Sequence, residues 1–281
     1  MTRGAAKRID SHHHVWRLLR GDYDWLIAED YPTLLCDFGA DDLAPLMADC
    51  LMDASVLVQA ASTVAETRYM LAVAEENPFI EAVVGWVDIT RADAPDTLAE
   101  LAANPLFRGI RPMMMYHDDG ARLADENQRQ ALQTMSRLGL VFDALVTADQ
   151  LDDLRHAMDA NPDLPFVINH FGYPDIADGD IAGWRESMAR IARDTSATVK
   201  FSGVMMGLGG DRPAADFRPA ADHLLEHFGP GRLMWGSDWP HLLADSDYPA
   251  WYALSQRLLE GTSAEDQAWI YGRTATTVYG L

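Results

Sequence analysis

Residues 9–16 form the stretch Ile9-Asp10-Ser11-His12-His13-His14-Val15-Trp16. It begins as a short apolar run and ends in histidines that are one residue apart. Side chains alternate between the two faces of a strand, so His12 and His14 point the same way while His13 points the opposite way. A His-x-His pair at a strand end is half of a metal site, or a paired donor set for an oxyanion.

The unit that starts there, a short β-branched and apolar run followed by a helical pattern, recurs along the chain. The runs are apolar on both faces, as in buried parallel strands. We expect strands at residues 7–12, 54–59, 80–88, 108–113, 140–145, 166–170, 198–202 and 233–236. We expect helices at residues 41–52, 65–76, 95–103, 127–138, 148–160, 183–194 and 217–228.

Eight strands that alternate with helices over about 250 residues are typical of a closed barrel. An open doubly wound sheet is disfavoured because no Gly-x-Gly-x-x-Gly follows the first strand. We therefore predict an α/β protein with a single (β/α)8 TIM-barrel domain over residues 1–281.

Composition narrows the class of protein. The chain has 281 residues, 48% of them hydrophobic, and contains no apolar run long enough to cross a bilayer. A net charge of −21 argues against a nucleic-acid partner, since no basic run could neutralise phosphates. Cys36 and Cys50 lack metal spacing and are too few for a disulfide framework. Because no secretory leader is recognisable, we expect a cytoplasmic protein without a membrane partner.

A polar and aromatic insertion at residues 17–37 follows the first strand. At the C-terminal face of a barrel, such a loop could act as a lid over substrate or could only pack on the rim. Its Tyr23 and Trp25 are predicted substrate contacts.

Chemistry in a barrel of this kind sits at the C-terminal ends of the strands. His12, His14, His170 and Asp238 come from the ends of strands one, six and eight, and we predict that these four, the quartet, are the catalytic residues. Together they could hold one divalent ion and a water molecule. Without an ion they could act directly as acid, base and oxyanion donors.

Other strand ends carry candidate substrate contacts. Arg111 is a predicted substrate clamp, because a strand-end arginine must otherwise find a buried carboxylate, and Asp88 or Asp143 could be that partner. Lys200 is expected to point outward or to pair structurally. His117 could reach the site, but a surface turn is the simpler interpretation. The predicted substrate-binding set is Arg111, Gln59, Trp86, Asp88, Tyr23, Trp25 and Trp239.

Several motifs together resemble those of the amidohydrolase superfamily, and within it the lactonase branch with sugar-lactone and pyrone-dicarboxylate hydrolases. They are Asp10-Ser11-His12-His13-His14, Gly109-Ile110-Arg111, Asn169-His170-Phe171-Gly172 and Trp235-Gly236-Ser237-Asp238-Trp239-Pro240. The resemblance extends over essentially the whole chain.

The resemblance implies attack of water on a lactone carbonyl, with Asp238 as the general base. His12, His14 and His170, with or without a bound ion, would polarise the carbonyl and stabilise the oxyanion. Binuclear relatives carry further ligands on strands four and five, and this chain offers none there. We therefore expect one ion at most, zinc being the candidate, and the branch also contains members that work without a metal.

We expect a hydrolase that acts on the carboxylic ester of a small-molecule lactone. The resemblance favours an aldonolactone such as an L-fucono- or L-rhamnono-lactone, in carbohydrate catabolism. The alternatives are a pyrone-dicarboxylate or muconolactone-type lactonase, a lactone isomerase, a non-oxidative decarboxylase of the same superfamily, and a barrel that only binds a sugar acid. Pro112 and Tyr173 depart from the sugar-lactonase pattern and replace polar groups that could contact hydroxyls. A homo-oligomer is a further expectation.

Overall fold

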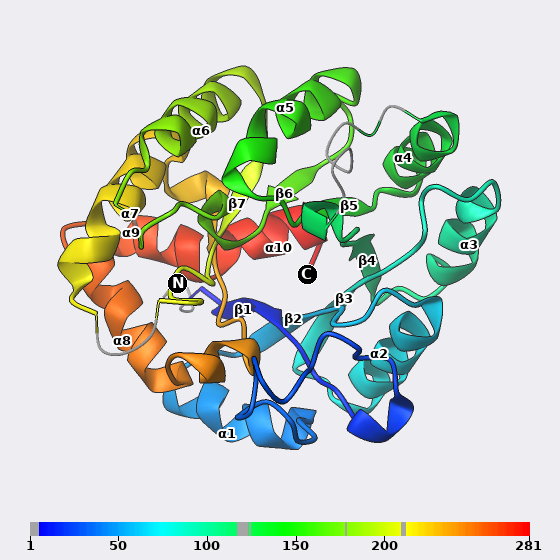
Figure 1. Cartoon of the computed structure of the whole chain (residues 1–281), viewed down its shortest axis with the longest axis horizontal. Coiled ribbons are helices and arrows are strands. Elements are labelled where there is room, and N and C mark those ends of the chain that lie inside the picture. Colours follow the sequence, from blue (N-terminus) through cyan, green and yellow to red (C-terminus); the bar gives the residue numbers. More distant parts are fainter. Residues whose placement is uncertain (1–5, 117–122, 124, 178, 209–211) are drawn as a thin grey trace, which may run out of the picture.

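Eight parallel strands form a barrel with helices around it (Figure 1), in a computed structural model that describes residues 6–116, 123, 125–177, 179–208 and 212–281. Each strand pairs with its neighbours in sequence, in the order β1 to β8. The strands are β1 (Ile9–His13), β2 (Ala54–Val58), β3 (Ile80–Gly85), β4 (Phe107–Ile110), β5 (Val141–Ala144), β6 (Phe166–Ile168), β7 (Thr198–Phe201) and β8 (Leu233–Trp235). The prediction of a (β/α)8 barrel is confirmed.

The expected helices are present with shifted ends, and further helices follow β8. They are α1 (Ala40–Asp49), α2 (Val64–Glu76), α3 (Ala94–Leu101), α4 (Glu126–Leu138), α5 (Leu151–Ala160), α6 (Ala182–Asp194), α7 (Ala214–Phe228), α8 (Tyr248–Leu258), α9 (Ala264–Ala268) and α10 (Thr274–Tyr279). The last three, α8, α9 and α10, were not expected from the sequence. A π-helical turn at Trp269–Arg273 interrupts the helical period between α9 and α10, which hides the pattern.

The barrel closes where β1 meets the chain just after β8. The backbone N–H of Asp238 donates to the carbonyl of His12 at 2.8 Å, and the N–H of His14 donates to the carbonyl of Trp239 at 2.6 Å. The buried carboxylate of Asp10 also accepts the backbone N–H of Ser237 at 2.8 Å. These bonds place Asp238 beside His12 and His14. The hydrogen bonds that close the barrel therefore also bring the residues of the candidate site together.

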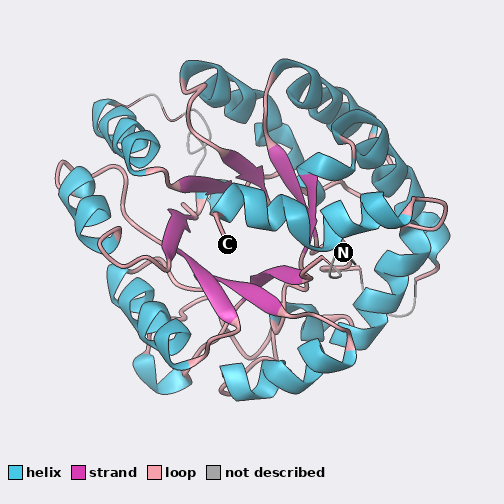
Figure 2. Cartoon of the chain, turned by 180° about the vertical axis from the view of Figure 1, so that it is seen from behind, coloured by secondary structure: helices cyan, strands magenta, loops and turns pink. Residues whose placement is uncertain are grey.

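The lumen is filled by the inward side chains of the strands, mostly valine, alanine and isoleucine. Helix α10 contributes Ala275 and Tyr279 to the same apolar cluster. Seen from behind, α10 lies across the opening formed by the N-terminal ends of the strands (Figure 2), where Gly280 O accepts a hydrogen bond from Arg108. One mouth of the barrel is therefore closed by the chain, and the chemistry is confined to the other.

Residues 17–37 pack on the rim of that other mouth. Trp16 and Phe38, at the two ends of the insertion, form an antiparallel bridge. Trp25 donates its indole N–H to the carbonyl of Ala60, in the loop after β2, at 2.7 Å. The rim-packing alternative thus describes this segment, and its action as a lid stays a prediction.

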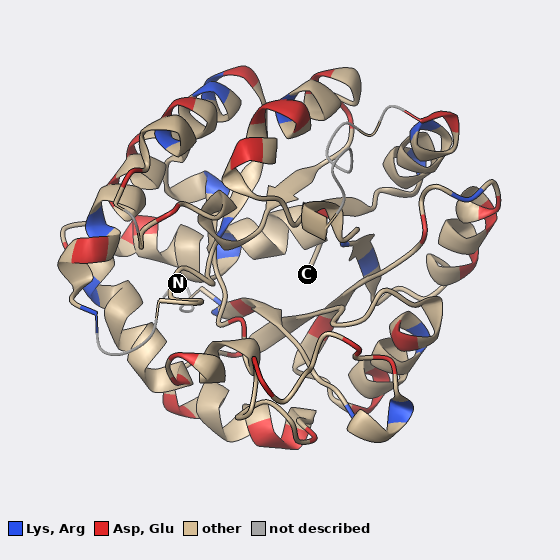
Figure 3. Ribbon diagram, viewed as in Figure 1, with Lys and Arg blue, Asp and Glu red and all other residues tan. Residues whose placement is uncertain are grey.

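Acidic residues are spread over the outer helices rather than gathered on one face (Figure 3). Within the part of the chain that the structure describes, no helix has the length and apolarity needed to cross a membrane.

Candidate active site

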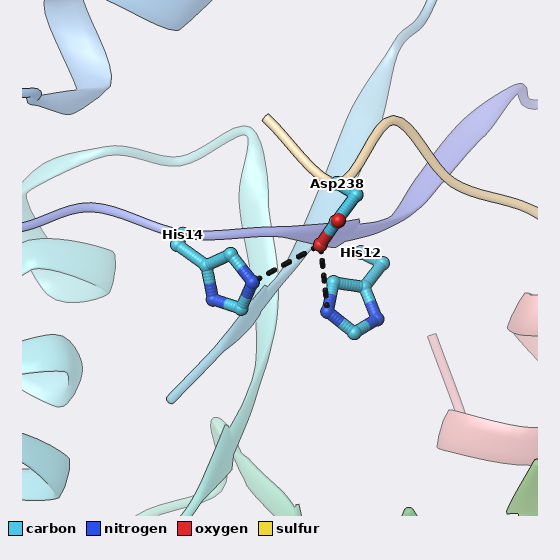
Figure 4. Close-up of side chains that lie close together, drawn as sticks. All are labelled: His12, His14 and Asp238. Atoms are coloured by element: carbon cyan, nitrogen blue, oxygen red, sulfur yellow. Dashed lines mark hydrogen bonds and ion pairs between the residues drawn. The ribbon is translucent and has the colours of Figure 1, made fainter. Parts of the chain in front are cut away.

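His12, His14 and Asp238 meet at one point (Figure 4). The Oδ1 atom of Asp238 lies 3.4 Å from Nε2 of His12, 3.2 Å from Nε2 of His14 and 3.7 Å from Nε2 of His170. All four residues are buried, and none is more than 5% exposed. The four predicted catalytic residues are therefore brought together by the barrel. Their roles in catalysis stay predictions.

Unusual backbone positions hold this arrangement. His170 and Asp238 have φ values of +52° and +62°, a region that residues other than glycine rarely adopt and that is often seen at functional sites. Gly203 and Gly236 make room for the imidazoles. A Cβ on Gly203 would lie 2.3 Å from the His170 ring, and one on Gly236 would lie 2.8 Å from Cβ of His12. Gly236 directly follows β8 and Gly203 lies two residues after β7, and any larger residue at either position would collide with a histidine side chain of the site.

Hydrogen bonds orient two of the imidazoles from behind. Nδ1 of His14 donates to the carbonyl of Val58 at 2.8 Å, because a carbonyl can only accept. In the neutral ring, the lone pair of His14 Nε2 therefore faces the carboxylate of Asp238. Nδ1 of His170 lies 3.0 Å from the hydroxyl of Ser202, which can donate or accept.

The charge state of the site follows from its burial. Burial lowers the pKa of His170 to about 3, so this imidazole is neutral at pH 7. Burial, followed by the charge of Lys200, also lowers the pKa of His12 well below its usual range. Burial alone would raise the pKa of Asp238, but the neighbouring imidazoles of His170, His14 and His241 hold it well below its ordinary value. The site thus presents the ionised carboxylate of Asp238 beside buried imidazoles.

One divalent ion fits this set of residues. The candidate ligand atoms of His12, His14 and Asp238 all lie within 4.8 Å of one another. Bonds of about 2.0–2.2 Å in a tetrahedron separate ligand atoms by about 3.4 Å, close to the observed spacings between the imidazoles and Oδ1. When Nδ1 of His14 donates to Val58, Nε2 of the neutral ring can bind a cation together with Oδ1 of Asp238, which lies 3.2 Å away.

Arg111 reaches the quartet from β4, where the sequence predicted it. Its Nη2 donates to the backbone and side-chain oxygens of Gln59, at 2.6 and 3.2 Å, and its Nη1 lies 3.3 Å from Nε2 of His12. Burial lowers its pKa. The expectation that Asp88 or Asp143 could be its carboxylate partner is wrong, because Asp88 accepts from Thr90 and Asp143 binds another cation. Gln59 is fully buried behind the guanidinium.

That other cation is Lys200, which lies inside the barrel directly below His12. Its Nζ is 2.5 Å from Oδ2 of Asp143 and 3.1 Å from Nδ1 of His12, and neither Lys200 nor Asp143 has any exposed side-chain surface. Structural pairing is one of the two expectations for Lys200, and its contact with His12 was not expected. The spacing could have shown it, since Lys200 is two residues before Ser202 and therefore shares its inward face.

Aromatic side chains form the rim above Asp238. The ring of His241 lies 5.6 Å from each of the rings of Trp25 and Tyr31. Among the described residues, Oδ2 of Asp238 makes no hydrogen bond, and Nδ1 of His241 approaches it at 3.5 Å. The insertion after β1 thus reaches the carboxylate through His241, a contact that the sequence analysis did not single out.

The contacts found for the remaining predicted substrate-binding residues are with other parts of the chain. The ring of Tyr23 packs near Trp16, and the ring of Trp239 packs on Phe38 within the core. Asp88 caps a turn that follows β3, and the backbone of Trp86 bonds to Thr67. His117 lies outside the described residues.

Comparisons with known proteins agree with this geometry. The family model described as amidohydrolase matches residues 9–281. The chain is 36% identical to an L-fucono-1,5-lactonase from Burkholderia ambifaria, over 98% of this chain and 96% of that protein. A zinc-bound amidohydrolase structure from Burkholderia multivorans superposes with a TM-score of 0.90 at 32% identity, covering 98% of this chain and 100% of that one.

A second structure shares the fold alone. It is a probable 2-pyrone-4,6-dicarboxylic acid hydrolase from Acinetobacter baumannii with bound citric acid, with a TM-score of 0.82 at 19% identity, and the match covers 98% of this chain and 100% of that one.

Proposed function

The chain belongs to the amidohydrolase family, and on that premise we propose that it hydrolyses sugar lactones of the L-fucono-1,5-lactone type. The observation that carries the proposal is the meeting of three imidazoles and one carboxylate at a single oxygen, Asp238 Oδ1. Similarity to an L-fucono-1,5-lactonase over nearly the whole chain supports the choice of substrate.

The chemistry needs one base and a set of donors. Asp238 accepts a proton from water as the water oxygen attacks the lactone carbonyl carbon. Its Oδ2, which has no hydrogen bond within the described residues, is the atom available for that proton. The tetrahedral intermediate then collapses, the bond to the ring oxygen breaks, and Asp238 returns the proton to the leaving alkoxide. The product is an open-chain hydroxy acid.

When no ion is bound, donors beside Asp238 stabilise the oxyanion. The guanidinium of Arg111 and the imidazole of His12 lie side by side, with Nη1 and Nε2 3.3 Å apart, in a buried environment. Electrostatic stabilisation is strong in such a water-poor site, where a lost donor typically lowers the rate by about 10²–10³-fold. Arg111 can do this without losing its position, because its Nη2 is held by Gln59.

Zinc is the ion that we propose for this site. His12, His14 and Asp238 would hold it, and a zinc ion supplies a Lewis acid that polarises a carbonyl and acidifies bound water. The zinc-bound relative from Burkholderia multivorans supports this identity.

A pH-indicator assay of acid release tests the proposed function. A panel of aldono-1,4- and 1,5-lactones is hydrolysed with and without chelator, and we expect the largest kcat/KM with L-fucono-1,5-lactone. Absence of acid release from every lactone would contradict the proposal, and release of CO₂ from an aromatic acid would favour the decarboxylase alternative. Loss of activity on chelation with recovery by zinc would establish the metal.

The cellular setting remains a set of predictions. The hydroxy acid produced fits a step in carbohydrate catabolism, and a cytoplasmic location is checked by fractionation of the native host. A homo-oligomer, checked by light scattering, is the predicted assembly.

A further inference from the structure

We propose that Glu66, in the first turn of α2, is a positioning residue for the active site. Its carboxylate fixes the backbone at residues 58–61, which we call the β2 end, and the carbonyl groups of the β2 end hold Arg111 and Trp25. The inference rests on the proposed function and deepens it, because Arg111 is the residue that donates to the lactone oxyanion there.

Three consecutive carbonyl groups of the β2 end each accept a hydrogen bond from a side chain at the mouth of the barrel. The bonds are those from His14 Nδ1 to Val58 O at 2.8 Å, from Arg111 Nη2 to Gln59 O at 2.6 Å and from Trp25 Nε1 to Ala60 O at 2.7 Å. The three donors come from separate parts of the chain. The position of this short backbone segment therefore sets the positions of all three side chains.

Glu66 binds the same segment through its N–H groups. The N–H of Ala60 donates to both carboxylate oxygens of Glu66, at 3.0 and 3.2 Å, and the N–H of Ala61 donates to one of them at 2.8 Å. Glu66 has no exposed surface, and a buried carboxylate is costly unless it is hydrogen-bonded. The β2 end cannot shift without leaving this carboxylate unpaired, so the bonds keep it in one position.

Capping of α2 does not account for these bonds. Thr63 is the N-cap of α2, and its hydroxyl accepts the N–H of Glu66 at 3.0 Å. A glutamate three residues after the N-cap ordinarily returns its carboxylate to the N–H of the cap residue. The carboxylate of Glu66 instead reaches past Thr63 to Ala60 and Ala61, and so it bonds to the β2 end.

Arg111 is coupled closely to the β2 end. Its Nη2 donates to both oxygens of Gln59, and Gln59 Nε2 donates back to the carbonyl of Arg111 at 3.0 Å. The backbone N–H groups of the two residues bond to β3, at Val84 O and Gly85 O, each at 2.8 Å. A shift of Gln59 therefore moves the guanidinium, and misplacement of a catalytic group by about 1 Å can lower the rate by about 10²-fold.

Glu66→Gln tests the proposal without changing the size of the side chain. The amide keeps one acceptor oxygen but turns its NH₂ group toward an N–H of the β2 end. We expect kcat/KM for L-fucono-1,5-lactone to fall by about tenfold or more. An unchanged kcat/KM would overturn the proposal.

Thr63→Ala is the matched control on the same helix. It removes the hydroxyl that caps α2 but leaves the bonds of Glu66 to Ala60 and Ala61 in place. We expect the midpoint of urea unfolding to fall and kcat/KM to stay at the wild-type value. Equal losses of kcat/KM in Thr63→Ala and Glu66→Gln would show that Glu66 acts only by stabilising α2, which would overturn the proposal.

A double-mutant cycle with Arg111→Lys tests whether Glu66 acts through Arg111. Residues that share one hydrogen-bonded unit give effects that do not add. In the Arg111→Lys background, we expect Glu66→Gln to lower kcat/KM by less than about threefold. A loss in the double variant equal to the product of the two single losses would contradict the coupling.

The indole N–H of Trp25 gives a readout that does not depend on turnover. In ¹H–¹⁵N spectra of tryptophan-labelled protein, its signal is identified by its absence in Trp25→Phe. We expect this signal to shift in Glu66→Gln, while the indole signal of Trp16, which donates to Cys36 O at 2.8 Å, stays in place. An unchanged Trp25 signal would overturn the proposal. A protein that hydrolyses no lactone but shows the shift would refute the proposed function alone.

Hydrogen exchange of the wild-type protein supplies a test that needs no variant, should Glu66→Gln not fold. Among the described residues, Glu66 is the acceptor found for the amides of Ala60 and Ala61. We expect both amides to exchange slowly, because exchange requires that the bonds to Glu66 open. Fast exchange at either amide would show that Glu66 does not hold the β2 end, and would overturn the proposal.

Discussion

Histidines point from both faces of the β1 segment, and the histidines on the two faces have different roles. His12 and His14 face the mouth of the barrel and meet Asp238, whereas His13 points the other way, where its Nε2 lies 2.9 Å from the hydroxyl of Ser55. All three rings are buried. Burial lowers the pKa of His13 to about 3, much as it lowers that of His170 in the site. Burial and residue type therefore do not distinguish a reactive histidine from a structural one, and the facing carboxylate does.

Replacement of that carboxylate should have the largest effect on activity. Asp238→Asn keeps the size of the side chain but removes the proton acceptor, so we expect kcat with L-fucono-1,5-lactone to fall by about 10³-fold or more. Initial rates in the pH-indicator assay measure this, with circular dichroism as the check on folding. A variant that keeps a tenth of the wild-type kcat would remove Asp238 from the role of base.

Arg111→Lys should have the next largest effect. The lysine keeps a positive charge but cannot bond to Gln59 and face His12 at the same time, so kcat/KM should fall by about 10²-fold. Arg108→Lys is the matched control, because Arg108 lies on the same strand and donates to Gly280 O at the opposite mouth. Equal losses in the two variants would show a general effect on β4.

Substitutions in the insertion at residues 17–37 should reduce activity less than substitutions in the barrel lumen. Trp25→Phe removes the hydrogen bond to Ala60 and the indole ring beside His241. Because a lost hydrogen bond of about 1 kcal/mol corresponds to a factor of about five, we expect KM to rise by about fivefold. The fully exposed Leu19 in the same segment gives the control variant Leu19→Ala, for which KM should not change. Steady-state kinetics compare the two, and an unchanged KM in Trp25→Phe would show that the segment only packs on the rim.

His13 should affect stability rather than turnover. Its folded-state pKa of about 3 lies below the ordinary value of 6.5, so its contribution to stability is complete above pH 6.5 and is lost as the pH falls toward 3. Relative to His13→Gln, the wild-type free energy of unfolding should therefore fall by about 1.4 kcal/mol per pH unit in that window. Urea titrations of both proteins measure the difference, and parallel curves would contradict it.

The wild-type protein must be compared with His13→Gln because two buried carboxyl groups change the free energy of unfolding with pH in the opposite direction. Burial raises the pKa of Asp10 to about 6 and that of Glu66 to about 7. The stability that these groups contribute is complete below their ordinary pKa values of 3.8 and 4.5 and is lost as the pH rises to about 6 for Asp10 and about 7 for Glu66. The wild-type curve alone would mix the two effects, whereas the difference isolates His13.

The sequence predicted the barrel and the quartet for a simple reason. Buried parallel strands are apolar on both faces, so polar residues at their ends stand out, and the ends of parallel strands meet at one mouth. Asp88 was placed too near the site because β3 ends at Gly85, and a strand end is poorly marked when apolar residues continue into the loop. The contact of Lys200 with His12 was missed because a pair inside the lumen joins strands far apart in sequence.

The most direct test compares the same substitution on the two faces of the β1 segment. His14→Gln and His13→Gln make the same substitution at neighbouring positions, and kcat/KM for L-fucono-1,5-lactone is measured for both in the same buffer. We predict a loss of about 10²-fold or more for His14→Gln and a value close to the wild type for His13→Gln. Equal losses at the two positions, or a fully active His14→Gln, would contradict the claim that the meeting with Asp238 creates the active site.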